Sequence, residues 1–414
     1  MSETTVPPPA AARTPAATDA APRTAGPAQL TLLLAGSCMA VLGAVLIAPV
    51  LPQMTDHFAG VAGVDVLVPI VLTVPALLIG LAAPFAGYVV DAVDRKRLLI
   101  AAMIAYSIFG TAPLYLPSLG TIIASRILVG LCEAAIMTCC TTLIADYWSG
   151  PRRSRYLSLQ TVIAALSATV FLGVGGALGT AGWRTPFWLY IIAAILAVPM
   201  ARLLWQPTPT RGSGPAVRRL PPAPWRQLLI PCLVTLVGGV IFYALIVQLS
   251  FVLNDAGVTS TATIGALSAM MSLGTAAGAG AFAKLSGSTP RRLLPIAFGL
   301  SALGLVLVFA TGSVPVVTIG AVLTGAGTGL LLPTLLTWSI NRLQFDQRGR
   351  GTGLWTGTLF IGEFLSPLLV AGIGAGTGGL RPALGVLAVV AAVLAVVTLL
   401  VIPRNAEPLN VTHG

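Results

Sequence analysis

Twelve long apolar segments constrain this chain more than any other feature of its sequence. A helix that crosses a lipid bilayer needs about 20 mainly apolar residues. Each segment reaches that length between charged residues or Pro and Gly clusters, and its apolar run is continuous rather than alternating, which disfavours a membrane β-barrel. We therefore predict an all-α polytopic membrane protein with spans at 29–54, 64–90, 97–117, 119–147, 155–180, 186–206, 227–254, 262–285, 291–312, 314–341, 348–376 and 381–402.

The charged residues support this prediction and give it an orientation. Only 8% of the 414 residues are charged, whereas soluble domains carry about 25%, so a single soluble domain is excluded. With the N-terminus in the cytoplasm, 20 of the 23 Lys and Arg residues fall on the cytoplasmic side, and only Arg184 and Arg381 fall outside. The positive-inside rule then predicts that both termini are cytoplasmic. Basic loops that face anionic lipid also account for the net charge of +11 without a nucleic-acid partner.

The longest internal polar stretch divides the spans into two sets of six. We predict an N-terminal six-helix bundle at 29–206, a cytoplasmic linker at 207–226 and a C-terminal six-helix bundle at 227–402. A Pro-, Ala- and Thr-rich tail at 1–28 is expected to be disordered and cytoplasmic, and a second cytoplasmic tail follows at 403–414.

The two sets of spans also resemble each other in sequence. At a constant offset of 195 residues, Lys96-Arg97-Leu-Leu matches Arg291-Arg292-Leu-Leu, and Asp146 matches Asn341. Duplicated halves around a central site are typical of transporters that work by alternating access.

Three motifs resemble those of the major facilitator superfamily. The loop from Gly87 to Arg97, G-Y-V-V-D-A-V-D-R-K-R, is similar to its cytoplasmic loop motif, with an Asp where the family has its second Gly. Span 4 carries Arg126-x-x-x-Gly130, and span 1 carries L-G-(x5)-P-V-L-P from Leu42, as in the drug:proton antiporter branch. The resemblance implies a fold of two pseudo-symmetric six-helix halves, with a central cavity lined by spans 1, 4, 7 and 10. It also implies a cytoplasmic gate formed by four residues of the loop, namely Gly87, Asp91, Arg95 and Lys96.

Span 5 departs from the antiporter pattern. That branch carries a Gly-Pro pair ahead of a Gly-Gly pair, and here Phe171-Leu172 stands at the Gly-Pro position before Gly175-Gly176. This departure keeps a proton-coupled importer or facilitator open as an alternative to export.

Two acidic residues lie inside predicted spans, Glu133 in span 4 and Glu363 in span 11. Because a charge at the bilayer centre is costly, such residues face the protein interior and are candidates for function. We predict that Glu133, Arg126 and Glu363 take part in proton coupling. The alternatives are an ion pair between Glu133 and Arg126, a membrane-interface anchor at Arg126, and a packing role for Glu363.

The predicted cavity spans also carry larger polar, aromatic and sulfur-containing side chains. We predict substrate contacts from Met39, Tyr243, Gln248 and Trp338, with ordinary helix packing as the alternative. A mainly apolar cavity with few polar groups suits amphipathic ligands.

These observations predict a secondary active transporter rather than an enzyme. The leading hypothesis is proton-coupled export of small amphipathic molecules, such as drugs or a metabolite, by alternating access; a non-transporting receptor and an intramembrane enzyme are alternatives from other classes. The sequence has no Walker motif, metal-ligand cluster or nucleophile–base pair, so no cofactor or metal is expected. The expected partners are the substrate, protons and the lipid bilayer. The chain is expected to be a monomer. Its Arg-, Ala- and Gly-rich composition is typical of GC-rich bacteria, so a bacterial plasma membrane is the expected location.

Overall fold

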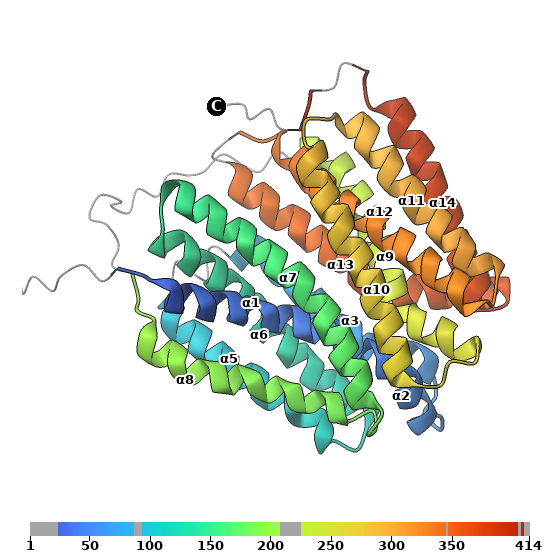
Figure 1. Cartoon of the computed structure of the whole chain (residues 1–414), viewed down its shortest axis with the longest axis horizontal. Coiled ribbons are helices and arrows are strands. Elements are labelled where there is room, and N and C mark those ends of the chain that lie inside the picture. The colour runs from blue at the N-terminus through green and yellow to red at the C-terminus, as the bar shows by residue number, and fades with distance from the viewer. Residues whose placement is uncertain (1–23, 87–92, 208–224, 345–346, 405–406, 410–414) are drawn as a thin grey trace, which may run out of the picture.

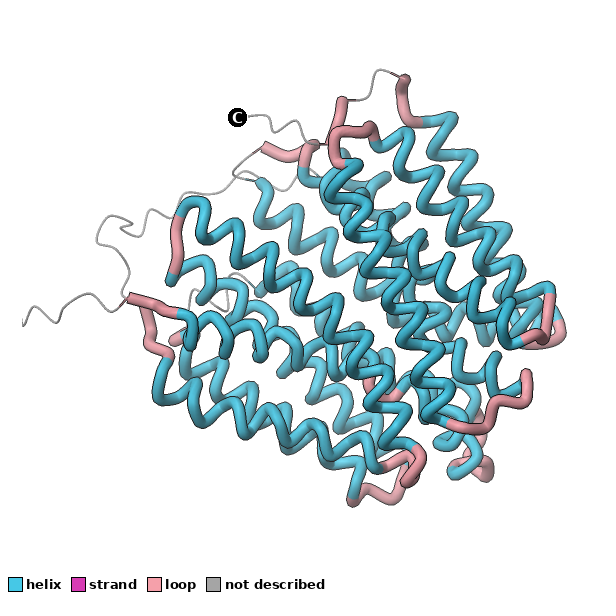
Figure 2. Tube along the Cα trace, in the orientation of Figure 1, coloured by secondary structure: helices cyan, strands magenta, loops and turns pink. Residues whose placement is uncertain are grey.

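The computed structural model describes residues 24–86, 93–207, 225–344, 347–404 and 407–409. Within these ranges every regular element is a helix (Figure 2). Four short 3₁₀ helices, η1 (Ala48–Val50), η2 (Ala83–Phe85), η3 (Ala112–Leu114) and η4 (Thr185–Tyr190), adjoin the α-helices. The α-helices are α1 (Pro27–Val45), α2 (Leu51–His57), α3 (Val64–Ala82), α5 (Arg95–Thr111), α6 (Leu119–Tyr147), α7 (Gly150–Gly179), α8 (Ile191–Leu203), α9 (Trp225–Asp255), α10 (Thr261–Leu285), α11 (Pro290–Ala310), α12 (Val314–Ile340), α13 (Arg348–Thr377) and α14 (Leu380–Val401).

The described helices form 12 segments that are long and apolar enough to cross a membrane, which confirms the predicted all-α polytopic fold. The first segment, Pro27–His57, is built from α1, η1 and α2. Most of the predicted tail at 1–28 and most of the predicted linker at 207–226 lie outside the described residues. The start of α1 and the end of α14 lie on one side of the molecule (Figure 1). We call this side the terminal side and the other the opposite side.

The internal repeat appears in the helix boundaries. Helices α5 and α11 begin 195 residues apart, at Arg95 and Pro290, and α6 and α12 begin at Leu119 and Val314. Each half has its own cluster of buried apolar residues. In Figure 1 the first half, blue to green, lies beside the second, yellow to red. The sequence repeat is therefore a structural repeat of two six-helix bundles.

The two halves meet along two helix pairs, α3 with α13 and α7 with α10. Glycines on the facing helices bring each pair close together, as is common in membrane proteins. Gly80 of α3 packs against Gly357 of α13 toward the terminal side. Gly176 of α7 packs against Gly265 of α10 toward the opposite side. In the first span, η1 and α2, which follow α1, also contact α9 of the second half.

Candidate functional site

Arg126 of α6 is fully buried inside the first half, with 0% of its side chain exposed. Its Nη2 donates a hydrogen bond to the carbonyl of Gly43 on α1 at 3.1 Å, and its Nε donates to the carbonyl of Val71 on α3 at 3.3 Å. The guanidinium carbon lies 5.0 Å from the centre of the Tyr190 ring. Arg126 therefore ties three spans together, and its interpretation as a membrane-interface anchor is wrong.

The carbonyl of Gly43 is available because the first span is broken. The last α-helical backbone bond of α1 runs from the Leu46 N–H to the Leu42 carbonyl, and Val50 then bonds to Ile47 in 3₁₀ fashion. Pro49 has no N–H to continue the helical pattern. The carbonyls just before the break, including that of Gly43, accept bonds from side chains instead.

Glu133 lies on α6 seven residues after Arg126 and is 1% exposed. One carboxylate oxygen, Oε1, lies directly against Gly43, where a Cβ atom would overlap it. Within the described part of the chain, no ion pair joins Glu133 to Arg126. Gly43 thus lies between the two charged side chains, because its carbonyl binds one and its lack of a side chain leaves room for the other.

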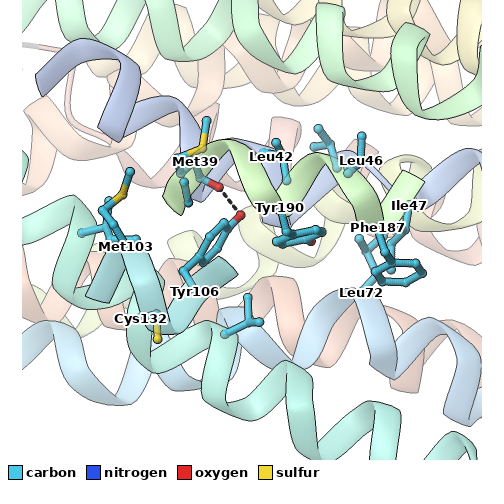
Figure 3. Close-up of a cluster of buried hydrophobic side chains, with 14 of the residues drawn as sticks. Met39, Leu42, Leu46, Ile47, Leu72, Met103, Tyr106, Cys132, Phe187 and Tyr190 are labelled. Atoms are coloured by element: carbon cyan, nitrogen blue, oxygen red, sulfur yellow. Dashed lines mark hydrogen bonds between the residues drawn. The ribbon is translucent and has the colours of Figure 1, made fainter. Parts of the chain in front are cut away.

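Two tyrosines lie beside Arg126 and Glu133. Tyr106 of α5 donates from its hydroxyl to the carbonyl of Met39 at 2.5 Å, shown as a dashed line in Figure 3. Its ring lies 5.0 Å from that of Tyr190, centre to centre. We call Arg126, Glu133, Tyr106 and Tyr190 the buried polar group.

Three atoms of the buried polar group lack a hydrogen-bond partner among the described residues. They are Arg126 Nη1, Glu133 Oε1 and the Tyr190 hydroxyl. Buried polar atoms are almost always paired, because leaving one unpaired costs about 1–3 kcal/mol. Three such atoms on interacting side chains mark a place that can accept a proton, a water molecule or a polar group of a ligand.

Glu363, the other predicted coupling carboxylate, lies in the second half. It is 5% exposed on α13, between Gly362, which packs against the carbonyl of Leu236, and Ser366, whose hydroxyl donates to the carbonyl of Val240 at 2.8 Å. The structure therefore brings Glu133 and Arg126 together and places Glu363 on a different helix pair, α13 with α9.

Two of the four predicted gate residues are described. Arg95 pairs with Asp146, which joins the start of α5 to the end of α6. The backbone N–H of Lys96 donates to Gln206 Oε1 at 3.4 Å. Gly87 and Asp91 lie outside the described residues, so the predicted gate stays a prediction.

The four predicted substrate-contacting residues are all buried, namely Met39, Tyr243, Gln248 and Trp338. The guanidinium of Arg342 covers the Trp338 ring at 4.6 Å. The hydroxyl of Tyr243 donates to the carbonyl of Ala44 at 2.6 Å. Their role in binding substrate stays a prediction.

Sequence reasoning missed a second polar cluster near the terminal side of the first half. Gln160 of α7 donates from Nε2 to Ser37 Oγ of α1 at 2.7 Å and to Thr141 Oγ1 of α6 at 3.1 Å. It also missed Tyr106 and Tyr190 in the buried polar group. No spacing rule connects these residues, because each lies on a different helix.

Twelve spans in two repeated bundles, with ionisable side chains buried inside both, define a secondary transporter rather than an enzyme. The family model of the Major Facilitator Superfamily matches residues 33–288 and 232–413. The chain therefore belongs to the major facilitator superfamily, as its motifs imply.

Relatives with curated names resemble parts of the chain. Multidrug resistance protein 1 of Bacillus subtilis is 28% identical over 180 residues, which is 42% of this chain and 44% of that protein. The Gallate transporter of Pseudomonas putida is 31% identical over 150 residues, which is 35% of this chain and 32% of that protein. Each match thus spans less than half the length of the relative.

Solved structures resemble the whole fold at low sequence identity. A bacterial homologue of the human lysosomal transporter Spinster, in an inward-facing conformation, has a TM-score of 0.72 and 17% identity, covering 90% of this chain and 97% of that chain. The peptide transporter POT has a TM-score of 0.69 and 14% identity, covering 91% and 94%. These similarities support the fold.

Proposed function

We propose that this transporter exports small amphipathic molecules in exchange for protons, with Glu133 as the proton carrier. The observation that carries the proposal is the buried carboxylate of Glu133, whose Oε1 lacks a hydrogen-bond partner among the described residues. An ionised carboxylate at mid-membrane depth costs about 2.5–3.5 kcal/mol on insertion scales. A group in such a place functions by gaining and losing a proton as its surroundings change.

Because Arg126 is close by, protonation of Glu133 changes the net charge of the buried polar group. With Glu133 ionised, the two side chains have no net charge, and with Glu133 protonated the buried polar group carries one positive charge. A buried uncompensated charge is unfavourable, so each protonation state favours a different arrangement of the spans that Arg126 holds. A ligand or proton that binds one arrangement better shifts the population toward it, which is the requirement for alternating access.

The multidrug resistance relatives of Bacillus subtilis support export of drug-like molecules. Two observations support the alternative, a proton-coupled importer or facilitator. One relative is a Gallate transporter rather than a multidrug resistance protein, and the Gly-Pro pair of the antiporter pattern is replaced by Phe171-Leu172. The direction of proton movement relative to substrate separates the two functions.

We also propose that the terminal side faces the cytoplasm of a bacterium, that the protein works as a monomer in the plasma membrane, and that the loop from Gly87 to Lys96 acts as its gate. The distribution of basic residues supports this orientation. Reporter fusions after the C-terminal residue and after Ala62 test it, because only the first should report a cytoplasmic location.

The test of transport uses the purified protein in proteoliposomes that enclose a pH-sensitive dye. Lipophilic cations, neutral antibiotics, aromatic acids and sugars are added with an imposed pH gradient. We expect substrate-triggered proton movement opposite to the substrate, lost in Glu133→Gln and retained in Asp56→Asn, which removes an exposed carboxylate. Proton movement with the substrate supports import, and normal coupled flux in Glu133→Gln refutes the role of Glu133.

A further inference from the structure

Tyr243 belongs to the second half by sequence but packs with the first. It lies on α9, is 2% exposed and joins the apolar cluster of the first half together with Val247. Its neighbours Ile241 and Ala244 on the same helix belong to the cluster of the second half. Helix α9 therefore presents one face to each half, and Tyr243 lies on the face toward the first.

The hydroxyl of Tyr243 makes a hydrogen bond between the halves. It donates to the carbonyl of Ala44, at the break in the first span, at 2.6 Å. The preceding carbonyl, that of Gly43, accepts the bond from Arg126. Two consecutive carbonyls thus bind two side chains from different halves, and the two peptide groups that hold them are joined at the Cα atom of Ala44.

We propose that Tyr243 is a positioning residue that transmits the state of Arg126 and Glu133 to the second half through the Gly43–Ala44 peptide. This transmission rests on the proposed function, in which Glu133 gains and loses a proton. The hydrogen bond from Tyr243 to Ala44 does not depend on that proposal. When Arg126 shifts, the carbonyl of Gly43 shifts with it. The rigid plane of the Gly43–Ala44 peptide carries this shift to the Ala44 Cα. The next peptide group, which holds the Ala44 carbonyl, begins at that atom and moves with it, so the bond from Tyr243 becomes stronger or weaker.

The contacts around the bond between Tyr243 and Ala44 indicate which arrangement of the two halves it stabilises. Next to it, η1 and α2 contact α9 toward the opposite side, where α7 and α10 also meet. The bond therefore stabilises the arrangement in which the halves are closed on the opposite side. Its loss should favour arrangements that are open there.

Several charged or titratable groups interact electrostatically with the Tyr243 hydroxyl. They are Glu133 and Arg126 on α6, Tyr190 on η4 and Glu363 on α13. Tyr243 thus lies within electrostatic reach of both buried carboxylates, one in each half. A test must separate a response to Glu133 from a response to Glu363.

The experiment measures the distance between the halves on the opposite side. Spin labels are attached at Ala62→Cys and Thr259→Cys, two exposed positions in loops of different halves. The five native cysteines are replaced, and transport of this background is first matched to that of the unmodified protein. Distance distributions are recorded in lipid nanodiscs from pH 5 to pH 9.

In Tyr243→Phe we expect the ratio of closed to open populations to fall by about fivefold, the effect of one neutral hydrogen bond, with a weaker response to pH. The matched control is Tyr147→Phe, which removes a hydroxyl bonded to the carbonyl of Trp205 at 2.6 Å within the first half. The control should keep the populations of the parent. Parental populations and pH response in Tyr243→Phe overturn the proposal.

A double-variant cycle tests the transmission from Glu133. If Tyr243 acts through the Gly43–Ala44 peptide, the effects of Glu133→Gln and Tyr243→Phe on the population ratio are non-additive. Additive effects overturn the transmission, as does a pH response that disappears in Glu363→Gln and persists in Glu133→Gln. Normal proton coupling in Glu133→Gln refutes the proposed function instead, and a shift in Tyr243→Phe then still supports the bond between the halves.

A second variant covers the case in which Tyr243→Phe fails to fold. Replacing Tyr243 by 3-fluorotyrosine keeps the ring and the hydroxyl and makes the hydroxyl a stronger donor. We expect a shift toward the closed population, opposite to that of Tyr243→Phe. A shift toward the open population contradicts the proposal.

Discussion

At the scale of single residues, Gly43 does more than a glycine in a membrane helix normally does. It provides the carbonyl that accepts the bond from Arg126, and its missing side chain leaves the space that Glu133 Oε1 fills. The L-G pair was visible in the sequence as part of a family pattern. That this glycine contacts Glu133 was not, because Gly43 and Glu133 lie 90 residues apart on different helices.

Gly43→Ala tests this contact directly. The added methyl group overlaps the Glu133 carboxylate, and small-to-large changes in packed cores cost about 1–3 kcal/mol. We expect transport in proteoliposomes to fall more than tenfold, with a lower melting temperature. The control is Gly299→Ala on α11, where a Cβ meets nothing within 4 Å; equal transport by both variants contradicts the assignment.

Arg126→Lys tests the geometry of the guanidinium rather than its charge. A lysine cannot donate to the carbonyls of Gly43 and Val71 in the same planar arrangement, so one carbonyl loses its partner. We expect coupled proton movement to fall more than tenfold. Arg184→Lys is the matched control, since Arg184 also donates to two carbonyls, those of Pro113 and Leu116, at 3.3 and 3.1 Å. The control should lose stability without losing coupling.

At the scale of helices, the break in the first span and the glycine contacts between the halves determine how the spans meet. The apolar pattern predicted 29–54 as one span, and the structure divides it near Pro49, because proline cannot continue the helical bonding pattern. The partners of the freed carbonyls could not be predicted, since they come from α6 and α9. Spacing along one helix contains no information about which other helix lies opposite.

Gly176→Ala tests the crossing of α7 and α10. A Cβ at Gly176 would overlap the carbonyl of Thr261 and press on Gly265, so the two helices must separate. We expect transport to fall more than tenfold, with a longer mean distance between spin labels on α7 and α10. On the same helix, Gly173→Ala adds its methyl group to open space and should behave like the unmodified protein. A normal distance in Gly176→Ala means that the crossing adapts.

At the scale of the whole molecule, the two halves share helix boundaries but not charges. The positions 195 residues after Glu133 and Arg126 are Thr328 and Ala321. The duplicated fold thus has its buried polar group in the first half only, and the second half has Glu363 on another helix pair. A proton taken up in the first half affects substrate access only if the second half responds, which makes the contacts between the halves part of the transport machinery.

Cleavage between the halves tests whether these contacts hold the molecule together. A protease site is inserted after Gly212 in the full-length protein, which is then cut after purification. We expect the two fragments to elute as one complex and to retain at least half of the transport rate, because α3 with α13 and α7 with α10 hold the halves together. The uncut insertion variant is the control. Separation of the fragments in mild detergent contradicts the expectation.

The fold was largely predictable from the sequence, and the site was predictable only in part. Apolar length and the distribution of basic residues predicted twelve helices, and the 195-residue repeat predicted two bundles. The cost of burying a charge identified Glu133 and Glu363 as interior residues, and the resemblance to the span-4 motif of the superfamily identified Arg126. Tyr106, Tyr190 and Gln160 could not be identified, because they belong to no motif and only tertiary packing brings them into the polar clusters.

The bonds that Arg126 and Tyr243 make to main-chain carbonyls determine which nearby positions can change in related proteins. Every amino acid supplies the same carbonyl, so Val71 and Ala44 can be exchanged for other apolar residues without loss of these bonds. Adaptation to a new substrate can therefore alter the side chains around the break freely. Gly43, Arg126, Glu133 and the aromatic donor at 243 are restricted in identity, and a lineage that changes its cargo should keep these four while its other first-span residues diverge.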